Sequence, residues 1–370
     1  MDAHGTDILI VLLVIGARLV VPLFIPRFPL PALITSLVID AIDQTIFQQF
    51  TTLDLAGYQS YDKSLDIYYL TIAYTAVLRN WTNGFAVEIA RFLWYYRLVG
   101  VVLFEITGTR AVLFVFPNTF EYYVIAIEVI RLGWDIRRLS RKALIGITAF
   151  IWIVIKLPQE WWIHIAGLDF TDFMKETVFG VESTSTWGEA LSNRPLVVAA
   201  ILAVFVAIGL VARHFWVRRP DQDWPLGVDA DRPMPPAELP GADRAQPPLR
   251  WPVFEKVVLI SLVSVVFSLM LGVDARGWQI LVAVTIVVVA NAGISAALAR
   301  RGTEWASIAL EFVVLTVVNA VLLSVIAAIV ADGIDRALSL FFGYLLTMII
   351  VLYDRFRARH FERVAALPAA

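Results

Sequence analysis

Apolar runs of about 20 residues recur from one end of the chain to the other, and they restrict its fold more than any other feature. A helix of that length crosses the roughly 30 Å hydrocarbon core of a bilayer. Within lipid, a helix satisfies every backbone N–H and C=O group inside its own segment. The composition agrees, because 59% of the 370 residues are hydrophobic and only 17% are charged. The sequence therefore predicts an all-α polytopic integral membrane protein.

The apolar runs place the expected helices. The run at 31–47 is apolar for only two turns before Asp40 and Asp43, so it is expected as a poor span, a re-entrant helix or an interfacial helix. The number of transmembrane helices is therefore about 10, or 11 if this run crosses. The other expected spans lie at 8–25, 64–80, 85–105, 111–131, 143–157, 195–217, 253–273, 278–299, 306–331 and 336–353.

A proline-rich stretch divides the chain. Residues 218–252 contain nine of the seventeen prolines and no apolar period, which is typical of a disordered or extended linker. The linker separates an N-terminal membrane unit, 1–217, from a four-helix unit, 253–353, and a basic tail, 354–370, follows. We expect the two membrane units to fold independently, with few contacts across the linker.

Clusters of arginine and lysine mark the cytoplasmic side of a membrane protein. They occur in the loop at 137–142, at 213–219, at 300–301 and in the tail, always on the same side of the spans between them. The linker and the C-terminus are therefore expected inside the cell, and 158–194 is expected outside, with Trp161 and Trp162 in an interfacial segment on the outer leaflet. Arginine far outnumbers lysine and alanine and valine are abundant, which favours a multi-pass protein of a bacterial plasma membrane.

The expected helices at 85–105 and 111–131 carry most of the charges that lie inside spans. Joined by a short turn at 107–109, they form an antiparallel hairpin in which Arg91 faces Glu128, Glu88 faces Arg131, and Arg97 lies level with Glu121. A lone charge at the centre of a span costs about 2.5–3.5 kcal/mol on insertion scales, so we expect these opposite charges to pair. Such pairs either lock two helices together or line a polar cavity.

Pro117 and Asn118 interrupt the second helix of this hairpin. Proline inside a span removes a backbone hydrogen bond and breaks or kinks the helix. Asn118 followed three residues later by Glu121 has the spacing of a capping box, so the helix is expected to restart there. Broken spans mark binding sites in transporters. The predicted substrate or ion path consists of Glu88, Arg91, Arg97, Asn118, Glu121 and Glu128.

A second candidate site is acidic. Its residues, Asp40, Asp43, Asp62 and Asp66, either form a solvated acidic loop or bind a divalent cation through carboxylate oxygens, and no other cofactor is expected. Asp40-Ala-Ile-Asp43, Gly57 and Asp62-Lys-Ser-Leu-Asp66 resemble the aspartate motif of CDP-alcohol phosphotransferases, whose aspartates hold divalent metals. Gln44 replaces the first glycine of that motif, and Asp62 lies one residue too far from Gly57.

Three classes of function remain open. The broken, charged hairpin favours a transporter or channel. The acidic cluster favours a membrane-embedded transferase that acts at the outer face on a lipid-linked or phosphorylated substrate, although no residue is assigned a catalytic role. Paired charges alone would suit a non-catalytic scaffold. The expected partner is the lipid bilayer and not nucleic acid, and self-association through the C-terminal helices is left open.

Overall fold

The computed structural model describes residues 3–52, 58–167, 170–217 and 219–232, with short stretches between 255 and 353. All regular structure in these residues is helical. Within the described residues, four helices are long and apolar enough to cross a membrane, and a fifth is added if the pair Trp187–Asn193 and Pro195–Val211, bent by 95°, counts as one span. The prediction of an all-helical fold is confirmed for these residues, and the apolar helices are compatible with a membrane protein. The expected spans beyond residue 253 lie mostly outside the described residues, so the total of ten or eleven stays a prediction.

The run at 31–47 forms an uninterrupted helix, which runs from Pro29 to Phe50. It is one of the four candidate spans, although it carries Asp40 and Asp43. The first helices are α1 (Ala3–Val20), η1 (Val21–Phe24), α2 (Pro29–Phe50), α3 (Tyr58–Asn80), α4 (Gly84–Thr107), α5 (Ala111–Val115) and α6 (Thr119–Arg131).

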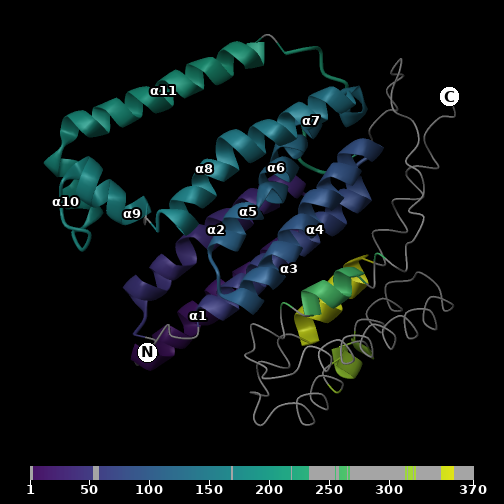
Figure 1. Cartoon of the computed structure of the whole chain (residues 1–370), viewed down its shortest axis with the longest axis horizontal. Coiled ribbons are helices and arrows are strands. Elements are labelled where there is room, and N and C mark those ends of the chain that lie inside the picture. Colours follow the sequence, from purple (N-terminus) through teal and green to yellow (C-terminus); the bar gives the residue numbers. More distant parts are fainter. Residues whose placement is uncertain are drawn as a thin grey trace, which may run out of the picture.

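Helix α3 is the centre of the bundle. It packs against α1, α2, α4 and α6, and Figure 1 shows it enclosed among them. Nearly all of its residues from Ser64 onward are buried. Because protein surrounds it, α3 tolerates polar side chains that lipid would exclude; Thr71 and Thr75 donate hydrogen bonds to backbone carbonyls of α3 itself. Among the spans that the structure describes, the least apolar one is therefore the most buried.

Helices α4 and α6 form the expected hairpin. Helix α4 ends at Gly108, whose φ of 64° is the left-handed conformation that glycine adopts without strain. Helix α5 then ends at Val115 and α6 begins at Thr119, so the break at Pro117 is confirmed.

The next helix is longer than the sequence indicated. Instead of ending near residue 157, it continues to Ile165 as α7 (Arg141–Phe150), η3 (Ile151–Lys156), α8 (Leu157–Glu160) and η4 (Trp161–Ile165). Its middle and last segments are π-helical on either side of Pro158, and a π-turn accommodates the proline without ending the helix. Trp161 and Trp162 therefore continue a candidate span instead of starting an interfacial loop.

The remaining helices lie beside this bundle. They are α9 (Phe170–Phe173), η5 (Met174–Phe179), α10 (Trp187–Asn193) and α11 (Pro195–Val217). Helix α11 has the bounds predicted for it and runs apart from α1–α6, as Figure 1 shows. Its leucine, valine and phenylalanine side chains are exposed all round, which suits a helix surrounded by lipid.

The described residues beyond α11 pack on the N-terminal bundle. Residues 219–232, the first part of the expected linker, are extended and hydrogen-bonded to it. Glu255 accepts hydrogen bonds from Tyr74, Arg91 and Tyr353. The unit boundaries near 217, 252 and 353 stay predictions, and residues 233–254 and the tail 354–370 lie outside the described residues.

Candidate functional site

Arg91, Glu128 and Arg131 of the hairpin form ion pairs, but not with the partners expected. Arg91 Nε lies 3.0 Å from Glu255 Oε1, and Glu128 binds Arg131 at 2.7 Å on its own helix. Glu88 is exposed. The predicted pairs Arg91–Glu128 and Glu88–Arg131 are therefore wrong.

The break in the second helix explains the error. Tyr96 donates to the carbonyl of Val115 at 2.8 Å, and Arg97 donates to that of Phe116 at 3.1 Å. In an unbroken hairpin Arg97 would lie level with Glu121. Residues 116–118 are not helical, and such residues advance about twice as far as the 1.5 Å rise of a helical residue. Everything after the break is therefore displaced along the hairpin axis.

At the break, α6 begins in the middle of the candidate span Ala111–Arg131 with an unusual cap. The side chain of Asn118 accepts no hydrogen bond from α6; its Nδ2 donates to Glu121 Oε2 at 3.0 Å. The expected capping box is therefore wrong. Glu160 of α8 partly replaces the missing cap, because its Oε1 accepts a hydrogen bond from the backbone N–H of Asn118 at 3.2 Å. A carboxylate at this position also complements the positive end of the α6 dipole.

Glu160 connects the break to a basic face of its own helix. Lys156 Nζ lies 3.1 Å from Glu160 Oε1, and His164 Nε2 lies 3.0 Å from Glu160 Oε2. The three residues are spaced by four, which places them on one helix face. Glu160 and Lys156 are each 4% exposed, so this group lies inside the bundle.

Glu121 connects the break to the central helix. The hydroxyl of Tyr69, on α3, donates to Glu121 Oε1, and both side chains are buried. Asp66 and Asp40 lie close enough to Tyr69 to act on its hydroxyl electrostatically. The tyrosine therefore lies between the carboxylate of the broken helix and a second acidic group.

That second group surrounds Arg18 of α1. Its guanidinium pairs with Asp40 and Asp43 of α2, and with Asp66 of α3 at 2.8 Å. Three of the four predicted metal ligands do come together, but the cation among them is Arg18. Among the described residues, no group of three His, Asp or Glu side chains is arranged to hold a metal. The side chain of Asp62 lies outside the described residues.

Together these groups form what we call the buried polar network. Among the side chains that the structure describes, five carboxylates face three permanent cations, two carboxylates more than these cations balance when His164 is neutral. Two further oxygen atoms at the break, Asn118 Oδ1 and Thr119 Oγ1, are buried without a hydrogen-bond partner. The network consists of Arg18, Asp40, Asp43, Asp66, Tyr69, Arg97, Asn118, Glu121, Lys156, Glu160 and His164.

Of the predicted path residues, the network includes Asn118, Glu121 and, through its electrostatic contact with Glu121 and Glu160, Arg97. It leaves out Glu88, Arg91 and Glu128. Sequence reasoning missed Tyr69 and Glu160, although the spacing of Lys156, Glu160 and His164 by four residues is a signal that could have revealed a helix face.

No protein-family model matches the chain, and no curated protein or solved structure matches it either.

Proposed function

We propose that the protein is transporter- or channel-like and carries protons through the buried polar network. The observation that supports this most directly is the excess of two negative charges within the network. An uncompensated charge inside a membrane bundle is costly, so the network favours taking up protons or a cation. Because the described carboxylates form no metal-binding group, protons account for this excess better than a divalent metal does.

The hydrogen bonds outline part of a route for those protons. The Tyr69 hydroxyl donates to Glu121 and lies within the electrostatic influence of Asp66, so a proton that Tyr69 passes to Glu121 can be replaced from the Asp66 side. On the other side, Asn118 donates through its side chain to Glu121 and through its backbone N–H to Glu160. Both contacts are N–H donors, so Asn118 holds the two carboxylates near each other and the proton between them needs a water molecule as carrier. Glu160 pairs with His164, whose side chain is 17% exposed against 5% for Glu160.

Neither alternative is favoured by a specific observation. A transferase would need its aspartates free for a metal and a phosphorylated substrate, whereas Asp40, Asp43 and Asp66 bind Arg18. A scaffold would need only balanced ion pairs that lock helices together. Glu128–Arg131 is such a pair, but the network has two carboxylates more than its cations neutralise.

Reconstituted protein tests the proposal. Liposomes that contain a pH-sensitive dye are given a potassium gradient with valinomycin, and proton uptake is followed with the wild type and with Glu121→Gln. We expect wild-type uptake well above that of empty liposomes and a return to background in Glu121→Gln. Glu88→Gln is the matched control, because Glu88 is a carboxylate of α4 outside the network, and it should conduct like the wild type. Uptake that does not exceed empty liposomes, or that survives Glu121→Gln unchanged, would overturn the proposal.

A further inference from the structure

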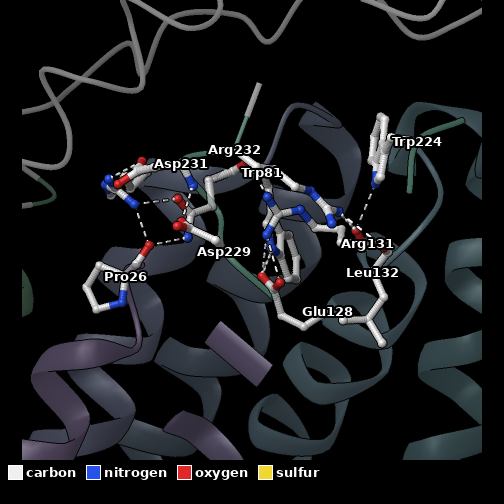
Figure 2. Close-up of polar contacts among 11 residues, drawn as sticks. Pro26, Trp81, Glu128, Arg131, Leu132, Trp224, Asp229, Asp231 and Arg232 are labelled. Carbon is white, nitrogen blue, oxygen red and sulfur yellow. Dashed lines mark hydrogen bonds and ion pairs between the residues drawn. The ribbon is translucent and has the colours of Figure 1, made fainter. Parts of the chain in front are cut away.

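The two ends of α6 differ in how their hydrogen-bonding groups are satisfied. At the C-terminal end, Arg232 Nη2 donates to the carbonyls of Arg131 at 2.8 Å and Leu132 at 3.0 Å, and Trp224 Nε1 donates to that of Arg131 at 3.3 Å (Figure 2). The last carbonyls of a helix have no partner within it, and these side chains supply one. At the N-terminal end, beside the break, the side-chain oxygens of residues 118 and 119 are buried and have no hydrogen-bond partner among the described residues.

The hydroxyl of Thr119 lacks a partner because of the break. Inside a helix, a buried threonine donates to a carbonyl three or four residues earlier, as Thr71 and Thr75 do in α3. Thr119 is the first residue of α6, and the carbonyl four residues before it is that of Val115, which lies across the break and accepts from Tyr96. Because Thr119 is only 1% exposed, bulk solvent does not satisfy its hydroxyl either. A buried hydroxyl of this kind calls for a bound partner.

The amide oxygen of Asn118 is left over for a different reason. Asn118 Nδ2 donates to Glu121 Oε2 at 3.0 Å, which fixes the orientation of the amide. Turning the amide over would set Oδ1 against a carboxylate oxygen, and two acceptors repel each other. The backbone N–H of the same residue donates to Glu160 Oε1 at 3.2 Å. The unpartnered oxygen therefore belongs to the one residue that both carboxylates contact.

A neutral molecule suits this position better than an ion. The carboxylates at the break are Glu121 and Glu160, and Lys156 and Arg97 both act on each of them electrostatically, so these four charges balance. A water molecule donates and accepts, which matches an amide oxygen that only accepts and a hydroxyl that does either. Buried water molecules typically make about three hydrogen bonds to polar groups that the protein leaves unsatisfied.

We propose that the break binds one ordered water molecule through Asn118 Oδ1 and Thr119 Oγ1, and that this water carries the proton between Glu121 and Glu160. Its role as carrier rests on the proposed function. In the transfer, the O–H bond of protonated Glu121 breaks and its proton joins the water oxygen, while one of the protons of that water passes to the Glu160 carboxylate. The water is regenerated, and Asn118 and Thr119 act as positioning residues that hold it between the two carboxylates.

Removing one hydroxyl tests the water site. Thr119→Val has nearly the same shape and helix propensity as the wild type but cannot form a hydrogen bond. With the water bound, we expect the unfolding temperature in detergent to fall by a few degrees and proton uptake to drop several-fold. Without it, the change removes an unpartnered buried hydroxyl, which stabilises the protein. An unfolding temperature that stays the same or rises would therefore overturn the water site.

Two further variants separate the lost hydrogen bond from a general disturbance of the fold. Thr119→Ser keeps the hydroxyl and should recover most of the proton uptake that Thr119→Val loses. Thr75→Val is the matched control, because Thr75 is 0% exposed and its hydroxyl bonds to a carbonyl of its own helix, so uptake should stay at the wild-type level. If Thr119→Ser and Thr119→Val lose uptake equally, the hydroxyl at this position does not support the transfer and the carrier role fails.

A map that resolves ordered water distinguishes this inference from the proposed function. By cryo-electron microscopy or crystallography, the wild type should show one water within hydrogen-bond distance of both Asn118 Oδ1 and Thr119 Oγ1, and Thr119→Val should lose it. A wild-type map in which both oxygens bond to protein atoms alone would overturn the water site even where the protein conducts. A map that shows the water in a protein without proton uptake would confirm the site and overturn both the proposed function and the carrier role.

Discussion

At the scale of single residues, Glu255 accepts hydrogen bonds from three donors, of which the two tyrosines are buried and Arg91 is half-buried. Arg91, Tyr74 and Tyr353 all donate to its carboxylate, which is 7% exposed as a residue. Removing one partner of a buried pair typically costs ~3–5 kcal/mol. Because the Arg91 side chain is 28% exposed, water screens part of this loss, and we expect Glu255→Ala to cost about 2 kcal/mol. Unfolding of the detergent-solubilised protein measures it.

The control is a pair of double-mutant cycles. Arg91→Ala with Glu255→Ala should be strongly coupled, whereas Arg91→Ala with Glu128→Ala should be additive within about 0.3–0.5 kcal/mol, since Glu128 pairs with Arg131. Coupling between positions 91 and 128 would contradict the structure. That each charge inside the hairpin needs a partner could be predicted from the cost of burial. The identity of that partner could not be predicted, because Glu255 is 164 positions away from Arg91 in the sequence.

At the scale of elements, the approach of the break to α4 depends on Gly100. A Cβ atom built there would lie 2.2 Å from Phe116 Cβ, a distance that forces the backbone apart. Overpacking of this kind costs about 1–3 kcal/mol, so Gly100→Ala should lower the unfolding temperature and weaken proton uptake. Gly146→Ala is the matched control: it lies in α7 with nothing within 4 Å of the new Cβ, and replacing a helical glycine should stabilise by about 0.5–1 kcal/mol. If Gly100→Ala and Gly146→Ala changed the unfolding temperature equally, the break would not pack closely against α4.

The elements also show where sequence reasoning reaches its limit. The bounds of α11 and the turn at Gly108 follow from an apolar run and a glycine, and both could be predicted. The break at Pro117 could be predicted as well. The displacement along the hairpin axis that it causes in every later residue could not be predicted. In the sequence, Pro158 indicates the end of a helix. In the structure, π-helical segments on both sides of it accommodate the proline, so Glu160 and His164 remain in the same helix.

At the scale of the whole molecule, the bundle has two distinct ends. One end contains Arg27, Arg138 and residues 219–232. At the same end, Asn83 Nδ2 donates a hydrogen bond to the carbonyl of Ile136 at 2.9 Å. The other contains the turn at Gly108 and the contact of Thr52 Oγ1 with Asp7 at 2.6 Å. Arginine-rich ends face the cytoplasm, so we expect residues 219–232 inside the cell and the Gly108 turn outside. In that orientation His164, near the end of the helix that begins at Arg141, lies nearer the outer end of the bundle.

Single cysteines decide the orientation. Thr109→Cys and Lys142→Cys are both exposed and lie at opposite ends of the bundle, whereas Ala230, at 6% exposed, would label slowly on either side and is a poor probe. In intact cells a membrane-impermeant maleimide should react with Cys at position 109 and spare position 142, and permeabilised cells should label both. The reverse pattern would place residues 219–232 outside. It would leave the contacts of the network unchanged, but it would put His164 nearer the cytoplasmic end of the proposed proton path.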